Sequence, residues 1–507
     1  MKSRNLAGTT ALLALIAGTA ATADVTPEEV WQNWQDLGTA AGQTIAAGAV
    51  SRDGDTLVVE DVTTAYAKDG ATVEATIDEI NFLDLGDGTV EVTMSDSYPI
   101  EMTLPAEAGK EGATPTDISI EVSQPGLEII VGGSTSETSY EFTAPTLGIK
   151  IVSIEGVDAA AIDLTFDITM SGVDGSYMVA GETDAKTLDS TLNLQSMALV
   201  VIGADPETQS DFNLTATIAD IQGASKGNLI GMAAMADLAA ALKAGFSSDG
   251  TFSFGALNFD LAVTEAGAPT KIVGTAAGGD MSFAMDASRL QYGSGSKDFS
   301  VTVQSPDIPF PEVKVNYAEA TFNMLMPLTK SDAPAPFSLL TRIVGLAVSD
   351  EIWGMIDPTA SLPHDPATLI IDAKGTATLT HDLMDPAQMA ALGDAPPGQL
   401  NALEVTELKA TIAGADLTGA GAFTFDNSDT TTFAGVPAPT GKLDLRLLGG
   451  NGLMDKLVAM GLLSAEDVTG ARFAMSMFAN AGPGEDELNS TLEFKDKGFF
   501  ANGQKLQ

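Results

Sequence analysis

The chain has 507 residues, with 24 lysines and arginines against 69 aspartates and glutamates, and therefore a formal net charge of −45. A chain this acidic is repelled by phosphate backbones and anionic membrane surfaces, which disfavours nucleic-acid binding. The absence of cysteine excludes disulfides, thiolate zinc sites, iron–sulfur clusters and a cysteine nucleophile, and two histidines are too few for a multi-histidine metal site.

The first residues have the three parts of a secretory signal peptide. Lys2 and Arg4 supply the basic start, residues 6–20 the apolar segment, and Ala21-Thr22-Ala23 a cleavage site of small residues. A buried N-terminal helix is the alternative interpretation. We expect cleavage after Ala23, export and a periplasmic location. No later apolar run has the length of a membrane-spanning helix, so we expect no transmembrane segment in the mature protein.

An amphipathic helix is predicted directly after the leader. Thr26 is suited to the N-cap, Pro27 to the first helical position, and Glu29 to a reciprocal capping bond. Trp31 and Trp34 fall on one apolar stripe of this helix. The pattern favours indoles that dock the helix onto a sheet, with ligand stacking as the alternative role.

From about residue 57 to residue 326 the hydrophobic pattern has a period of two. Phe166, Ile168 and Met170, for example, alternate with Asp167 and Thr169. Such strands have one polar face, which indicates an antiparallel sheet. We therefore expect a mainly β (α+β) fold: a large, elongated, twisted, mostly antiparallel sheet covered by a few amphipathic helices.

Helices are expected at 229–244, 337–348, 349–356 and 451–463, with a further helix cap at Ser464. The proline-rich segment 331–336 is a predicted boundary. The expected organisation is a signal peptide at 1–23, an N-terminal helix plus antiparallel β region at 24–330, and a C-terminal α+β region at 331–507 that closes with a β-hairpin.

One short pattern is typical of serine hydrolases. Residues 223–227 read G-x-S-x-G around Ser225, and His364 and His381 follow it in the order that such enzymes require. The surrounding strands alternate, however, and no regular βα series builds the parallel sheet that this motif needs. We expect no catalytic residue, and keep a secreted serine hydrolase using Ser225 as an alternative.

The two histidines also raise a metal-binding hypothesis, because His364 and His381 each precede an aspartate. The same residues are typical of exposed turns beside Asp-Pro breakers. We expect no metal site and no cofactor, and a His/Asp metal-binding protein remains the second alternative.

Methionine-rich strand faces suggest a different kind of site. Two strands each carry large apolar residues on one face, and such faces adapt to irregular partners. Core filling is the simpler explanation, and an apolar groove for an acyl chain or for a hydrophobic segment of an envelope protein is the alternative. The candidates for ligand contact are Trp31, Trp34, Met281, Phe283, Met285, Phe322 and Met324.

Three stretches carry a family resemblance: Ala23–Trp31 with Trp34, Leu362–Asp372, and Asn451 through Leu506. Together they resemble the exported bacterial domain-of-unknown-function family 2125, over nearly the whole mature chain. The resemblance implies an exported protein of Gram-negative bacteria without an established activity, and gives no catalytic residue to transfer.

The long amphipathic strands are also similar in style to AsmA-like envelope proteins, which implies an apolar sheet face and a part in phospholipid handling. We expect this chain to depart from them in lacking a membrane anchor. The leading hypothesis is a non-enzymatic periplasmic binding or structural protein that holds a lipid or another hydrophobic ligand on an apolar sheet face. Its partners would be that ligand or an envelope protein, and no nucleic acid.

Overall fold

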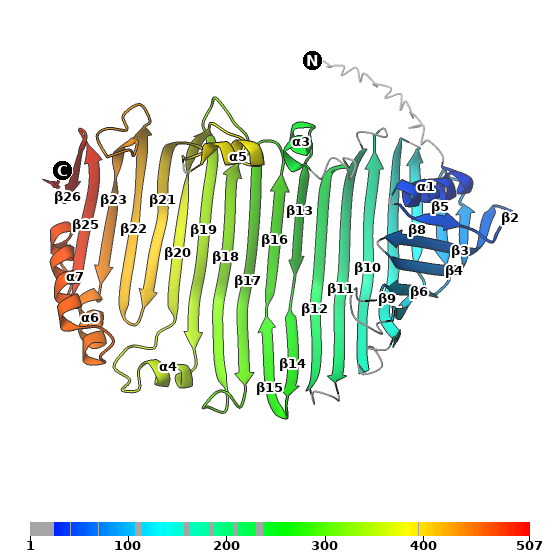
Figure 1. The fold of residues 1–507 in the computed structure, drawn as a ribbon, viewed down its shortest axis with the longest axis horizontal. Helices are drawn as coiled ribbons and strands as arrows, with labels where there is room; N and C mark the ends of the chain where they lie inside the picture. The colour runs from blue at the N-terminus through cyan, green and yellow to red at the C-terminus, as the bar shows by residue number, and fades with distance from the viewer. Residues whose placement is uncertain are drawn as a thin grey trace, which may run out of the picture.

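The computed structural model describes residues 25–507 except 41, 69, 107–113, 135, 157–162, 182–185, 206–209, 230–236 and 394. The described strands, 27 in all, belong to one hydrogen-bonded sheet in which each recorded pairing is antiparallel. The strands stack side by side along the long axis of the molecule (Figure 1). The predicted fold class is therefore confirmed. The predicted signal peptide and its cleavage site lie outside the described residues.

Short strands and one helix build the N-terminal end of the molecule. Helix α1 spans Pro27–Ala40. The strands β1–β8 are Thr44–Ala46, Ala49–Asp53, Thr56–Lys68, Ala71–Asp84, Val90–Met94, Ser97–Leu104, Thr116–Ser123 and Glu128–Ser134.

Longer strands continue the sheet from there. The strands β9–β16 are Glu137–Glu155, Asp163–Ala180, Lys186–Asp205, Ser210–Leu229, Ser248–Phe254, Leu257–Glu265, Ala268–Ala276 and Gly278–Met285. The strands β17–β23 are Arg289–Gln304, Val313–Pro327, Ala335–Val348, Ala367–Leu379, Gly398–Ile412, Ala415–Asp426 and Ala438–Leu448. The strands β24–β27 are Asn480–Ala481, Glu487–Lys495, Gly498–Ala501 and Gln504–Lys505.

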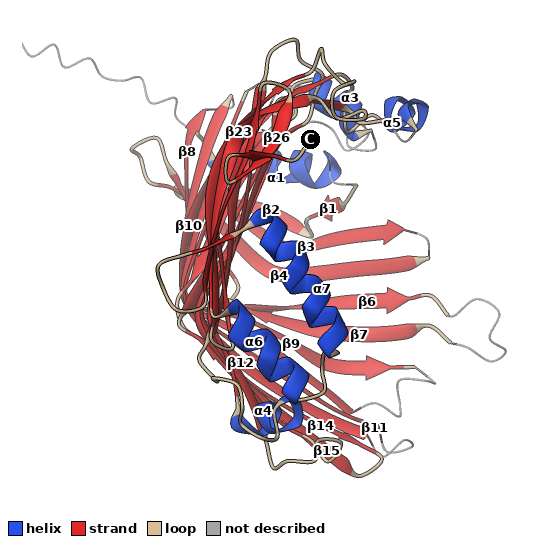
Figure 2. Cartoon of the chain, turned by 90° about the vertical axis from the view of Figure 1, so that its left-hand side faces the viewer, coloured by secondary structure: helices blue, strands red, loops and turns tan. Residues whose placement is uncertain are grey.

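Five more helices lie in the connections of the described part of the chain. They are α3 (Leu238–Lys243), α4 (Asp350–Ile356), α5 (Pro386–Leu392), α6 (Gly450–Ala459) and α7 (Ala465–Phe478). Seen along the stacking direction, the sheet is curved, and α1, α3, α5, α6 and α7 lie on its concave side (Figure 2). None of the described helices is long and apolar enough to cross a membrane.

Helix α1 begins as its sequence predicts. The Thr26 backbone N–H donates to Glu29 Oε2 at 3.0 Å, and the Glu29 N–H donates to Thr26 Oγ1 at 3.3 Å, which completes a reciprocal capping box. Trp31 and Trp34 pack against Phe82 of β4, with ring centroids 6.0 Å and 5.4 Å apart. Trp31 is buried in the N-terminal core. The docking role of these indoles is therefore confirmed, and ligand contact by Trp31 and Trp34 stays a prediction.

A line of backbone irregularities crosses the sheet and bends it. Gly172 in β10, Asp220 in β12, Asp298 in β17 and Gly345 in β19 all have positive φ, from +47° to +71°. Strand pairings place Gly172 level with Asp220, and Asp298 level with Gly345. Between the two groups, the strands themselves are interrupted at the same level, by the connection from β13 to β14 and by that from β15 to β16. We call this line the crease.

The hydrophobic alternation changes phase at the crease. In β10 the apolar positions are even-numbered up to Met170 and odd-numbered from Val173 onward. Met170 nevertheless packs against the buried cluster that contains Val173, so both halves direct apolar side chains to the same side. A left-handed residue inserted in a strand produces such a local reversal, together with a bend. The crease therefore gives a curved sheet with one continuous apolar face.

One predicted helix is wrong. Residues 337–348 form strand β19, which pairs with β18 on one side and β20 on the other. The phase change at Gly345 separates Ile343 from Leu346 by three residues, which imitates helical spacing in the sequence.

The other helix expectations fit the described residues. Ser349 precedes α4, the expected helix at 451–463 is α6, and the Ser464 hydroxyl accepts from the Asp467 N–H at 3.0 Å as the N-cap of α7. Of the helix expected at 229–244, residues 238–243 form α3, and residues 230–236 lie outside the described part.

The C-terminal hairpin is present as β25 and β26. Across the predicted boundary at 331–336, β18 and β19 pair directly. The division of the chain into two regions stays a prediction.

Candidate functional site: an open apolar trough

Two rows of apolar side chains run across the middle of the sheet. Residues that pair directly in an antiparallel sheet have side chains on the same face, so the register defines each row. The first row contains Leu192, Phe252, Met281, Phe322, Ile371 and Leu408. The second row contains Phe283, Tyr292, Met324, Leu339 and Val405. We call these two rows the trough floor.

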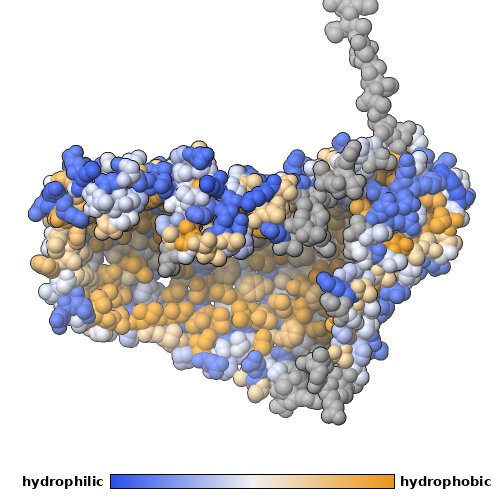
Figure 3. All heavy atoms as spheres, turned by 45° about the horizontal axis from the view of Figure 1, so that its top comes forward, coloured by the Kyte–Doolittle hydropathy of each residue, from blue (hydrophilic) through white to orange (hydrophobic). Residues whose placement is uncertain are grey.

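Contacts at both ends show that the trough floor faces the concave side. The second row continues to Tyr140, whose hydroxyl accepts from Asn33 Nδ2 of α1 at 3.0 Å. The first row continues to Ser490, whose hydroxyl donates to the Phe478 carbonyl of α7 at 2.6 Å. Both helices lie on the concave side of the sheet (Figure 2). The hollow is lined by hydrophobic residues and bordered by hydrophilic ones (Figure 3).

The trough floor is open to its surroundings along much of its length. Met281 is 48 % exposed, and Leu192, Phe252, Phe283, Leu339 and Ile371 are also exposed. From β11 to β21 the two rows cross eight strand spacings of ~4.8 Å, which gives a length of roughly 38 Å. Monomeric proteins rarely expose a contiguous apolar surface of this extent unless it binds something.

The opposite face of the same strands is charged. Lys226 and Asp189 are direct cross-strand partners joined at 2.9 Å, and Lys374 and Glu404 are partners joined at 3.4 Å. Arg342 lies between Glu319 and Glu407, at 3.9 and 3.8 Å. The polar phase of the alternation therefore forms the outer surface, and the apolar phase forms the trough.

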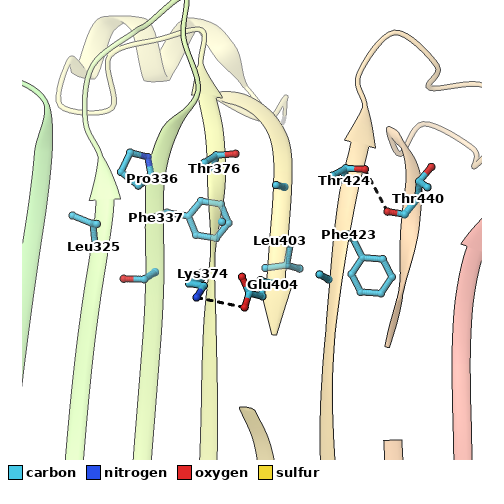
Figure 4. Close-up of a pocket in the computed structure, with 14 residues that line it drawn as sticks. Leu325, Pro336, Phe337, Lys374, Thr376, Leu403, Glu404, Phe423, Thr424 and Thr440 are labelled. Atoms are coloured by element: carbon cyan, nitrogen blue, oxygen red, sulfur yellow. Dashed lines mark hydrogen bonds and ion pairs between the residues drawn. The ribbon is translucent and has the colours of Figure 1, made fainter. Parts of the chain in front are cut away.

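The C-terminal half of the trough contains a defined hollow of about 610 Å³. The rings of Phe337 and Phe423 lie on either side of Leu403 (Figure 4), and the Lys374–Glu404 ion pair drawn with them belongs to the opposite face of the same strands. Gly375 allows the Phe337 ring to pack directly over the backbone, because a Cβ at this position would clash with the Ala402 carbonyl oxygen and lie 2.6 Å from the ring. The volume is within the usual range for ligand pockets.

The structure brings together the methionine-rich candidates that the sequence indicates. Met281, Phe283 and Met285 of β16 share a face with Phe322 and Met324 of β18, across the single strand β17. Ligand contact by these residues stays a prediction. Sequence reasoning missed Leu192, Phe252, Leu339 and Ile371, which continue the same rows and which the alternation of their own strands could have indicated.

Ser225 does not form a nucleophile elbow. It lies inside β12, between β11 and β13, and its hydroxyl is 2.7 Å from that of Ser190. About six strand spacings separate β12 from β20, beside which both histidines lie, and this corresponds to roughly 29 Å. Ser225 is therefore a polar position in the row of Phe283, and it has no histidine base.

The two histidines are also separated from each other. His364 precedes β20 and His381 follows it, so a strand of 13 residues, about 40 Å long, lies between them. His364 stacks on Trp353 of α4 at 4.3 Å, and His381 Nδ1 is 2.9 Å from Thr380 Oγ1. A shared metal site is excluded by this geometry. In the described part of the chain no group of three or more acidic or histidine side chains has the arrangement of a metal site.

Asp357, beside His364, has a structural role. Its carboxylate accepts from the Leu362 N–H at 2.6 Å and from Thr359 Oγ1 at 3.1 Å. Burial alone would raise the pKa of Asp357, but these hydrogen bonds outweigh it and hold the pKa below its usual value. The carboxylate fixes the loop after α4, and His364 Nε2 lies 3.8 Å from it, beyond hydrogen-bond distance.

Comparison with known proteins identifies the family over more than half of the chain. Residues 233–502 match the family described as uncharacterized proteins conserved in bacteria, DUF2125. The chain belongs to this family. The match begins after β12 and contains the stretch Leu362–Asp372 and all but the last four residues of the stretch from Asn451 to Leu506. Coverage of nearly the whole mature chain stays a prediction. No curated protein and no solved structure matches the chain.

Proposed function

We propose that this protein is an exported, non-enzymatic binding protein of the bacterial envelope, and that its trough holds the acyl chains of lipids. The observation that supports the proposal is the trough floor itself, an exposed apolar surface on the concave side of a charged sheet. Aqueous exposure of such a surface is unfavourable, at about 25 cal/mol per Å² of apolar area. A bound hydrocarbon ligand removes this cost.

The chemistry of the floor favours hydrocarbon chains over a polar ligand. Its two rows contain aliphatic, methionine and aromatic side chains and no charged residue, and the Tyr292 and Phe322 rings lie 6.1 Å apart. Methionine and aromatic surfaces adapt to chains of varying shape. The leader-like N-terminus, with its small-residue cleavage site, supports placement of the protein outside the cytoplasm.

The test compares methionines on the two faces. Met281 lies on the trough floor, whereas Met178, which is 37 % exposed, pairs with Asp189 on the charged face. The full chain is expressed with its leader, purified from the periplasm, and analysed by native mass spectrometry and lipid extraction. We expect bound lipid in the unaltered protein.

Affinity for an NBD-labelled phosphatidylethanolamine should fall by about tenfold or more when Met281→Gln and Phe283→Gln are combined, since each change removes roughly 1.5 kcal/mol of apolar contact. Met178→Gln is the matched control and should leave the affinity unchanged. Recovery of a lipid-free protein, or an equal effect of the two sets of substitutions, would refute the proposal.

A further inference from the structure

The α6–α7 unit carries the most exposed large apolar side chain in the described part of the chain. Phe473 of α7 is 70 % exposed, and Met477, one turn later, is 52 % exposed. Leu462 and Leu463, in the connection between α6 and α7, are also exposed. We call these four residues the α7 patch.

The orientation of α7 is fixed by contacts on its other side. Arg472 donates from Nε to Asn451 Oδ1 at 3.0 Å and pairs with Asp455 of α6 at 2.8 Å. Val468 is buried. The Phe478 carbonyl accepts hydrogen bonds from Ser490 Oγ and from Asn502 Nδ2, at 2.6 and 2.9 Å. The α7 patch is therefore held outward by packed contacts and is not a frayed end.

The acidic coat is also weak at the C-terminal end. Residues 438–507 contain seven lysines and arginines against nine aspartates and glutamates, a net charge of −2. The whole chain carries −45. An anionic phospholipid surface therefore repels this end less strongly, per residue, than it repels the chain as a whole.

We propose that the α7 patch docks the protein on a phospholipid bilayer, with Phe473 and Met477 inserted at the boundary of headgroups and acyl chains. Protruding aromatic and aliphatic side chains on an otherwise polar helix have this property. The patch lies at the end of the trough, because α7 contacts Ser490, which belongs to the same row as Leu408 of the trough floor (Figure 2). The purpose of docking rests on the proposed function: docking there would place the open trough against the bilayer from which lipid enters or leaves.

The experiment measures co-flotation of the full mature chain with phosphatidylcholine vesicles. Phe473→Ser combined with Met477→Ser should lower vesicle binding by about tenfold or more, because two apolar side chains no longer enter the bilayer. Met355 and Ile356 of α4, 54 % and 50 % exposed, provide a matched control pair away from this end. Met355→Ser with Ile356→Ser should bind vesicles as the unaltered protein does. Lack of binding by the unaltered protein, or an equal loss in the control, would overturn the proposal.

Two further measurements separate this inference from its alternatives. Met281→Gln with Phe283→Gln should reduce lipid loading and leave vesicle binding intact, so docking and loading can fail independently.

Vesicles with 25 mol % phosphatidylglycerol should bind less protein at low salt, and added salt should restore binding. If the Phe473/Met477 variant converts a dimer to a monomer and neither protein binds vesicles, the patch is an interface between copies and bilayer docking is wrong.

Discussion

The crease can be tested at Gly345, where β19 changes the phase of its side chains. Gly345 has φ of +71°, a conformation that costs a residue with a Cβ about 1–2 kcal/mol. A Cβ there would lie 3.3 Å from that of Ala318, which requires a small additional shift. Gly345→Ala should therefore lower the free energy of unfolding by about 1–2 kcal/mol, measured by urea denaturation.

Gly354 is the matched control for this substitution. It lies inside α4, and a Cβ there would meet nothing within 4 Å. Gly354→Ala should raise the free energy of unfolding by about 0.5–1 kcal/mol, because alanine is the better helix former. If Gly345→Ala stabilised the protein as Gly354→Ala does, the crease would not depend on left-handed backbone and this account of the bend would be refuted.

Three further predictions concern the rest of the molecule. Thr26→Ala removes the capping bond of α1 and should lower the free energy of unfolding by about 1 kcal/mol, as followed by thermal denaturation. Glu487 accepts from Arg446 and Asn489, which lowers its pKa to about 2, so the stability that this carboxylate contributes above pH 4.5 should be lost as pH falls from 4.5 towards 2. Urea denaturation across that range should show a shallower acid decline for Glu487→Gln. Ser225→Ala should leave the rate of generic ester hydrolysis at background; a measurable fall would revive the hydrolase hypothesis.

The amino-acid sequence allows the strands and their charged face to be predicted, because alternation with a period of two is a local property. The pattern at Phe166, Ile168 and Met170 is sufficient to assign an antiparallel strand with one polar face. The same local property explains why the helix predicted for residues 337–348 is wrong. A phase change inside a strand brings apolar residues to spacings of three, and only the neighbouring strands β18 and β20 decide between helix and strand.

The trough as a site was only partly predictable. The shared face of Met281 and Phe283 follows from their own strand, but the alignment of Met281 with Phe252 and Ile371 depends on register across several strands. Whether an apolar face is covered by another layer is a tertiary property that alternation does not contain. For the same reason the isolated G-x-S-x-G pattern suggested an elbow, whereas its glycines lie within a strand beside Ser190.

The acidic composition has a physical connection with the open trough. An exposed apolar surface favours association between molecules, and a net charge far from zero opposes it. Charged side chains such as Asp189 and Lys226 lie on the outer face, while the trough floor stays uncharged. The C-terminal end, with a net charge of −2 over residues 438–507, combines weak repulsion with the exposed Phe473. The weak charge of this end therefore supports the bilayer docking that we propose for it.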